Sequence, residues 1–296
     1  MKIQIVTHLL PHELDEFERQ LCIFSQCELQ DMVVLDVTLN MNTFDDSSTI
    51  HRQFFINKFN QLCDYVTKTK WCKSAIFDVN HDGTCRGVND KRRNSIRTYA
   101  NTVDAFLYLD SDVIFPPHAL PYIIHCAKQV KNQYYIVTPQ IPKIWDHTWD
   151  HLVNDAFVNE PYGFEKKVNP YQIVNQSYGD VYLTKSPNIK IGGGWFNLIS
   201  SSLLMHTNIP DDLGPYGVDD TYVMYCAQIM KHSGKDVEQY IMNNIVVAEN
   251  YLLRHNPYKH FIKYKEGRDD FKSVAESNLR KCLVEFQQNN NYVLTK

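Results

Sequence analysis

Apolar residues in the first half of the chain form short continuous runs, and stretches with helical spacing separate these runs. The runs are rich in β-branched and aromatic residues, which is typical of buried strands. They are Ile3–His8, Met32–Val37, Ser74–Val79 and Ala105–Leu109. Helices are expected between them, around residues 17–24, 53–68 and 90–101. Strands that alternate with helices predict an α/β fold with a mostly parallel sheet.

The second half keeps this pattern at its two ends but not in its middle. A helix is expected after Pro116 and Pro117, followed by a strand at Tyr134–Val137. Residues 139–190 are rich in Trp, Tyr, Asn, Asp and Pro and lack long periodicity, which indicates an elaborated loop region over the sheet. Later elements are expected as a strand-like end of Asn188–Met205, a helix from Asp219 to about Lys231, a strand at Tyr240–Val247 and a terminal helix near Asp269–Phe286.

Composition narrows the class of protein. The 296 residues are 44% hydrophobic and 22% charged, which is typical of a globular chain. A net charge of -4 argues against broad adhesion to nucleic acid. The eight cysteines are scattered without a C-x-x-C pair, which favours buried thiols over a zinc site. Because the sequence shows no secretory leader and no apolar stretch of membrane-spanning length, we expect a soluble, cytoplasmic protein.

The strongest chemical signal follows the fourth predicted strand. Ala105–Leu109 runs directly into Asp110-Ser111-Asp112. A carboxylate at the end of a buried strand is costly to desolvate unless it is paired or binds a ligand. Two acids separated by one residue can hold a hard divalent cation. The alternative interpretation is a solvated turn, because Asp and Ser are common turn residues.

Motifs on both sides of this D-x-D carry a resemblance to a known family. The segment from Arg93-Asn94 through Ala100-Asn101 to Asp110-Ser111-Asp112 resembles the family-2-like glycosyltransferases of the GT-A fold, where an Arg-Asn helix precedes the D-x-D strand. The order of parts continues with the glycine loop Gly192–Trp195 and with Gly217-Val218-Asp219-Asp220 before a helix. These correspond to the acceptor loop and the acidic pair of that family. The specific motifs are confined to residues 93–112 and 192–220.

The resemblance implies an enzyme that moves sugar from a nucleotide-diphosphate donor to an acceptor hydroxyl. Transfer of a single sugar is expected, because the sequence lacks the Gln/Arg-x-x-Arg-Trp motif of processive synthases and lacks membrane spans. It implies Mn2+ or Mg2+ as cofactor and favours a UDP-sugar as donor. Residues 1–262 would form the catalytic domain, with 1–138 as its nucleotide-sugar half and 139–262 as its acceptor half. Residues 263–296 would form a helical tail.

Residue type and place along the chain, and for Asp220 the family position, indicate a role for each candidate residue. Asp112 and Asp110, with His255 as a further ligand, would hold the metal. Asp220 would act as general base with Asp219 beside it, which implies inversion at the anomeric carbon. The acceptor would contact Gly193, Gly194 and Trp195. Donor contacts are expected from Asp110 near the ribose, from Arg93 to phosphate, and from three residues at the ends of early strands, Asp36, Asp78 and Thr7.

The sequence departs from the family pattern and leaves alternatives open. The acidic pair is Asp-Asp where the family usually has Glu-Asp, so which of the two is the base stays open. A nucleotidyltransferase is one alternative, although the first strand lacks the glycine-rich loop that such enzymes carry after it. A non-catalytic sugar-binding module is another. The acceptor stays open among a glycan, a small molecule and a hydroxymethylated DNA base.

Overall fold

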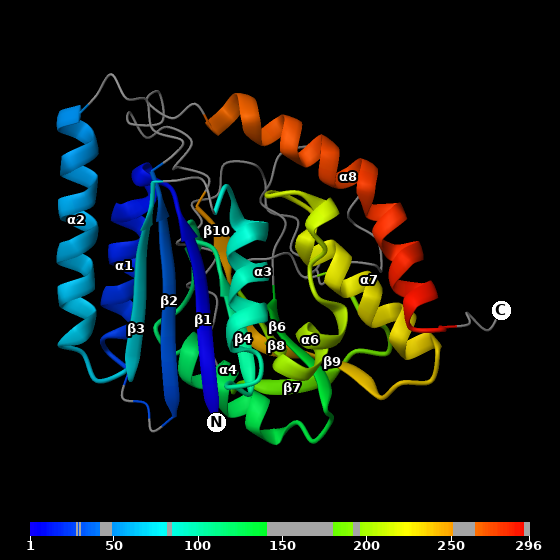
Figure 1. Cartoon of the computed structure of the whole chain (residues 1–296). Helices are drawn as coiled ribbons and strands as arrows, with labels where there is room; N and C mark the ends of the chain where they lie inside the picture. The colour runs from blue at the N-terminus through cyan, green and yellow to red at the C-terminus, as the bar shows by residue number, and fades with distance from the viewer. Residues whose placement is uncertain are drawn as a thin grey trace, which may run out of the picture.

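The computed structural model describes residues 1–27, 29, 31–41, 49–81, 85–140, 180–191, 196–250 and 264–292. Eight strands of these residues form one sheet in the order β3-β2-β1-β4-β8-β6-β9-β7 (Figure 1). Their bounds are β1 Lys2–Leu9, β2 Met32–Asn40, β3 Ser74–Asn80, β4 Ala105–Leu109, β6 Tyr134–Gln140, β7 Tyr182–Lys185, β8 Phe196–Ser200 and β9 Val237–Val246. Only β8 and β7 run antiparallel to their neighbours among these strands. The predicted α/β fold with a mostly parallel sheet is therefore confirmed.

Helices cover both faces of the sheet. On one face lie α1 (Leu14–Phe24), α2 (Thr49–Thr67) and α4 (Ala119–Gln129), whose apolar residues join one buried cluster with the sheet. On the other face lie α3 (Val88–Tyr99), α6 (Ser201–Thr207), α7 (Asp219–His232) and α8 (Tyr264–Asn289). Figure 1 shows α2 at the outer edge beside β3, and α8 crossing over α7. Alternate residues along β1 explain the two layers, since Ile3 and Ile5 belong to the first cluster and Val6 to the second.

Helix α3 packs on the sheet through polar side chains. Its buried residues include Asn89, Asp90, Lys91, Arg92, Arg93 and Ser95. Opposite them on β2 lies Asp36, which accepts hydrogen bonds from Gln4 (2.8 Å), Ser95 (2.6 Å) and Lys91. Replacing such buried ion pairs by apolar residues of similar volume is often neutral or stabilising. The buried polar contact between α3 and the sheet therefore indicates a role other than stability.

In the second half of the chain, described elements differ from the sequence prediction at two places. A loop is predicted across 139–190, but β7 lies within that range and pairs with β9; residues 141–179 lie outside the described part. Strand character is predicted up to Met205, but β8 ends at Ser200 and α6 follows. Ser200 Oγ accepts a hydrogen bond from Leu203 N at 3.3 Å, so this serine is an N-cap that starts a helix. No helix in the described part of the chain is long and apolar enough to cross a membrane.

Candidate functional site

The candidate site lies where the order of the strands changes direction. β2 and β3 follow β1 on one side, whereas β4 pairs with the other side of β1. Open α/β sheets bind ligands outside the carboxyl ends of strands at such a switch point. The D-x-D residues Asp110-Ser111-Asp112 come directly after β4 and lie at this edge.

Side chains from the start of the chain hold the D-x-D turn in place. Gln20 on α1 is fully buried, and its Nε2 donates to the backbone oxygens of Asp110 (2.9 Å), Ser111 (3.0 Å) and Val113 (2.9 Å). Glu13 lies in a short helix, η1 (Pro11–Glu13), and accepts a hydrogen bond of 2.8 Å from Ser111 Oγ. The backbone of the motif is therefore fixed from the α1 side.

Arg92 on α3 joins the two predicted acidic motifs. Its Nη2 donates to Asp110 Oδ1 at 2.7 Å, and its Nη1 donates to Asp219 Oδ2 at 2.7 Å. The guanidinium also lies over the ring of Tyr108, 4.5 Å from its centroid. The side chain of Arg92 is 3% exposed, so solvent screens these ion pairs little. Acids that are 109 positions apart in the sequence thus share one cation.

Negative charge exceeds positive charge around this arginine. Burial raises the pKa of Asp110 to about 7; Arg92 opposes this shift, and the neighbouring carboxylates of Asp112, Asp219 and Asp220 add to it. Burial and Asp219 likewise raise the pKa of Asp220. Burial lowers the pKa of Arg92, but Asp219 and Asp110 outweigh burial, so the guanidinium stays charged. The site is therefore suited to bind a cation and to exchange a proton near neutral pH.

The donor set at this edge fits a hard divalent cation in part. Carboxylate oxygens are the ligands that Mg2+ and Mn2+ prefer, and the excess of carboxylates favours a bound cation. Within the described ranges, however, no group of three His, Cys, Asp or Glu side chains is placed to hold an ion. The described residues would therefore supply part of a coordination shell, through Asp112 and Asp110. Mg2+ is commonly held in this way, by one or two carboxylates and substrate phosphates.

Asp219 and Asp220 open α7 in different surroundings. Asp219 is 3% exposed and is paired with Arg92. Asp220 is half-buried and accepts a long contact of 3.4 Å from Thr221 Oγ1. Before this pair, Val218 has a left-handed backbone with φ of 51°, which is an outlier for a β-branched residue. Such outliers gather at functional sites, and here one directly precedes both acids.

Asp36 has a different place from the one predicted. The sequence predicts that the second strand ends there, but β2 continues to Asn40, so Asp36 lies mid-strand opposite Val6. Its side chain is nearly inaccessible and binds Lys91 and two neutral side chains in the interior. These contacts of the Asp36 side chain are all made inside the protein, and its donor contact stays a prediction. The predicted strand ends too early because a buried ion pair, Asp36 with Lys91, interrupts the apolar pattern of β2 at this position.

Two other strand-end predictions have separate outcomes. Thr7 is fully buried inside β1, which ends at Leu9, so its side chain is not accessible to a ligand. Asp78 is exposed on the outer strand β3, two residues before its end at Asn80. The donor contact predicted for Asp78 stays a prediction.

Neutral polar side chains, which the sequence prediction missed, lie at the carboxyl ends of β1, β2 and β3. His8 Nε2 lies 3.3 Å from Asn40 Nδ2, and Asn40 is the register partner of Asn80. Burial, with the charges of Lys91 and Arg92, lowers the pKa of His8 to about 3. His8 is therefore a neutral imidazole at physiological pH. Asn40 has no exposed surface and Asn80 is 2% exposed, so these amides bind protein groups at this edge.

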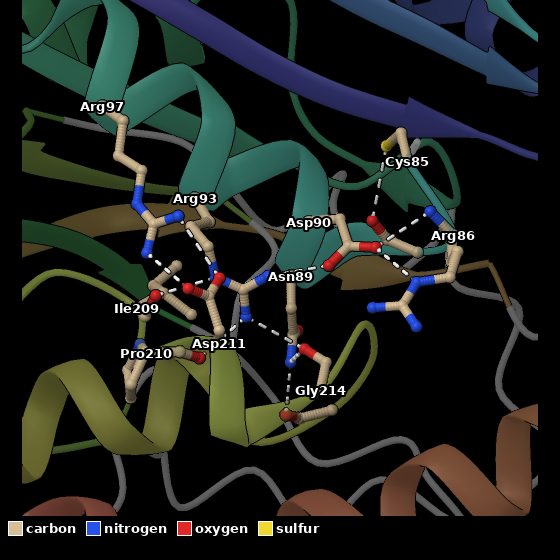
Figure 2. A network of polar contacts seen from close by, with 12 residues as sticks. Cys85, Arg86, Asn89, Asp90, Arg93, Arg97, Ile209, Pro210, Asp211 and Gly214 are labelled. Atoms are coloured by element: carbon tan, nitrogen blue, oxygen red, sulfur yellow. Dashed lines mark hydrogen bonds and ion pairs between the residues drawn. The ribbon is translucent and has the colours of Figure 1, made fainter. Parts of the chain in front are cut away.

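Arg93 binds protein groups, and its predicted phosphate contact stays a prediction. Its Nη1 donates to Asp90 Oδ1 at 2.7 Å (Figure 2). Its Nε and Nη2 donate to three backbone oxygens of the segment 209–214, those of Ile209, Pro210 and Gly214, at 2.8, 2.8 and 3.1 Å. A phosphate would have to displace these bonds. Its neighbour Arg92 is the arginine that reaches the site, and a charge run such as Lys91-Arg92-Arg93 gives no sign of which member does so.

Four predicted site residues lie outside the described part of the chain, namely Gly193, Gly194, Trp195 and His255. Their described neighbours lie close to the D-x-D turn. Phe196 pairs in register with Leu109 at the end of β4. A short strand β10 (Ala248–Glu249) pairs with β5 (Val113–Ile114), and Asn250 N donates to Asp112 O at 2.6 Å. The metal and acceptor roles of the four residues stay predictions.

Several solved structures are similar to this chain at low identity. One is TarS 1–349 from S. aureus, with 8% identity and a TM-score of 0.44 over 83% of this chain and 60% of that one. The same protein in complex with UDP-GlcNAc has 8% identity and a TM-score of 0.47 over 84% of this chain and 59% of that one. A mycobacterial protein has 14% identity and a TM-score of 0.43, covering 84% and 67% of the two chains. The chain thus matches about three fifths of the length of the TarS 1–349 structures. No protein-family model and no curated protein matches the sequence.

Proposed function

We propose that this chain is a glycosyltransferase that moves a single sugar from a nucleotide-diphosphate donor to an acceptor hydroxyl. The observation that carries the proposal is the bridge formed by Arg92. Asp110 of the D-x-D motif and Asp219 of the second acidic pair both bind its buried guanidinium group at the sheet's switch point. A donor-side motif and an acceptor-side motif then share one edge, as a two-substrate transfer requires.

The donor would bind along the carboxyl ends of β1 to β4. The D-x-D carboxylates lie at the β4 end of this edge. A divalent cation at Asp112 and Asp110 would neutralise the charge that develops on the departing diphosphate. Gln20 keeps the backbone of that turn fixed while the leaving group departs.

Asp220 is the better candidate for the general base. Its side chain is half-buried, and its raised pKa moves it toward the operating pH, which suits a base. Asp219 is less suited, because its carboxylate is buried and already paired with Arg92. Asp219 would instead fix the start of α7 so that Asp220 faces the acceptor.

The transfer proposed here is a single displacement. The acceptor oxygen forms a bond to the anomeric carbon while the bond from that carbon to the donor phosphate oxygen breaks. The proton of the acceptor hydroxyl passes to Asp220, and the bonding pair leaves with the nucleoside diphosphate. Attack opposite to the leaving group inverts the anomeric configuration.

A thermal-shift panel followed by a product assay tests this function. The panel contains UDP-glucose, UDP-N-acetylglucosamine and GDP-mannose, each with and without manganese. A donor that binds the folded state must raise its apparent stability, and we expect a larger rise with manganese. The best donor should then release its nucleoside diphosphate, slowly to water and faster with an acceptor.

Each rival gives a different result in the same experiment. A nucleotidyltransferase would release pyrophosphate from a nucleoside triphosphate and a sugar phosphate. A non-catalytic sugar-binding module would be stabilised by sugars without any turnover of donor. Stabilisation by none of the panel, together with no release of nucleoside diphosphate, would rule out the proposed function for these donors. A second panel of glycans, small molecules and hydroxymethylated DNA then identifies the acceptor.

A further inference from the structure

The turn that leads into α7 has an unusual backbone. Gly214, Gly217 and Val218 all have positive φ values, of 77°, 92° and 51°. Glycine adopts such conformations without steric cost, but a β-branched residue does not. A strained residue of this kind persists only where the surrounding structure determines its conformation. The turn 214–218 must therefore be held by contacts from elsewhere.

Asn89 on α3 supplies those contacts. Its side-chain Nδ2 donates to Gly217 O at 3.0 Å and to Gly214 O at 3.2 Å. Its backbone N–H donates to Pro215 O at 2.9 Å. The residue has no exposed surface, so water cannot replace these bonds readily. One buried side chain thus joins the beginning of the turn to its end.

The start of α3 touches the turn so closely that no side chain fits between them. A Cβ atom on Gly87 would lie 2.4 Å from Pro215 O, and this oxygen is a backbone atom that moves only if the turn moves. Gly87 therefore allows the approach that brings Asn89 within hydrogen-bond distance. Figure 2 shows Asn89 pointing from the start of α3 toward Gly214.

Helix α3 also fixes Asp219, the residue after the strained Val218. Arg92 follows Asn89 by three residues on α3 and binds Asp219 at 2.7 Å. Asn89 binds the carbonyl just before Val218, and Arg92 binds the side chain just after it. The chain is thus held on both sides of Val218. These contacts set the orientation of Asp220, which follows in the first turn of α7.

We propose that Asn89 is a positioning residue for the transfer, because it keeps the turn 214–218 in the conformation that directs Asp220 at the acceptor. The proposal rests on the proposed function, since it takes Asp220 as the base. It differs from a purely structural role in one measurable respect. Loss of the Asn89 bonds should reduce turnover much more than it reduces donor binding.

The experiment uses the full chain with three variants. Asn89→Asp has the same size, but its carboxylate cannot donate to the two carbonyl oxygens. Asn89→Asp combined with Val218→Asn adds a residue that tolerates the left-handed region. Asn278→Ala is the matched control, because Asn278 on α8 also donates to a backbone oxygen of a neighbouring loop, that of Asp212 at 2.7 Å.

Two readouts are measured on each variant. One is hydrogen exchange of the backbone amides of residues 215–222. The other is kcat and KM for the panel member that stabilises the wild type most. For Asn89→Asp we expect exchange at least about tenfold faster and kcat about 10- to 100-fold lower, with donor KM nearly unchanged. The control should change neither readout, and Val218→Asn should recover part of both losses.

The outcomes separate this proposal from the function on which it rests. Unchanged exchange in Asn89→Asp would show that Asn89 does not hold the turn. Faster exchange with unchanged kcat would show that the turn is held for stability alone, and would also overturn the proposal. If Asn89→Asp does not fold, the double variant carries both readouts. A wild type that turns over no donor refutes the proposed function, whereas the exchange comparison still decides whether Asn89 holds the turn.

Discussion

Arg92 and Asp219 form a buried ion pair in which Nη1 lies 2.7 Å from Oδ2, and the two side chains are 3% and 4% exposed. The pair joins α3 to the first turn of α7. The other arm of the same guanidinium reaches Asp110, so a single side chain sets the relative positions of both acidic motifs. Removing one partner of such a pair leaves an uncompensated buried charge.

Arg92→Met should therefore destabilise the protein and abolish transfer. Breaking a buried ion pair by removing one partner costs about 3–5 kcal/mol, and urea unfolding measures this loss. Asp219→Asn in the Arg92→Met background should restore part of the stability, because the charge of Asp219 is gone whereas Asp110 still lacks its partner, but it should not restore activity. Arg92→Lys should also fail in catalysis, since one ammonium cannot present the two-armed geometry. An Arg92→Met protein as stable as the wild type would contradict this account.

The outline of the fold and the main motif were predictable because they rest on local patterns. β4 is an unbroken apolar run whose predicted bounds, Ala105–Leu109, match the structure. The turn at Asp110 follows from the sudden change to polar residues. Gly234 follows the end of α7 at His232, and its φ of 85° agrees with a helix-ending glycine.

The partners of the site residues were not predictable in the same way. Arg92 lies in a run of three basic residues that local pattern alone assigns to a solvated face. Only the packing of α3 on the sheet separates Arg92, which faces the acids, from Arg93, which binds the segment 209–214. Gln20 and Asn89 act on segments roughly 90 and 125 positions away along the chain, and no local pattern encodes such contacts.

Asp112→Asn tests whether the D-x-D motif binds metal. We expect the variant to fold and to lose the extra thermal shift that manganese gives with a nucleotide sugar, because a neutral amide is a poorer ligand for a hard cation. Transfer should be lost as well. Asp64→Asn, on the exposed side of α2, is the control and should behave as the wild type. Full activity of Asp112→Asn, or of the wild type in excess chelator, would disprove the metal role.

His8 should make the fold sensitive to acid. Its pKa is lowered from 6.5 to about 3 in the folded protein, so between these values the unfolded chain binds a proton that the folded chain does not. Stability should fall as pH decreases through this window, with a slope of up to about 1.4 kcal/mol per pH unit from this residue. His8→Gln should lack this component of the slope. The test is urea unfolding of both proteins at pH 7, 5 and 4, and parallel curves would refute the assignment.

Asp220→Asn tests the general base. Removing a base that acts in the transition state should lower kcat by roughly 100- to 10,000-fold, whereas donor affinity should change little because Asp220 is not placed among the donor's ligands. The contribution of Asp220 to the acidic limb of the pH–rate profile should also disappear: the raised pKa of Asp220 means that the wild-type rate rises with pH as this carboxylate loses its proton. Asp219→Asn is the contrasting variant, since the pairing with Arg92 predicts a loss of stability together with lower activity and a retained acidic limb. The anomeric configuration of the product, read from its NMR coupling constant, gives an independent check. A product that retains the donor's configuration would exclude Asp220 as the base of a single displacement, even if the Asp220→Asn protein were inactive.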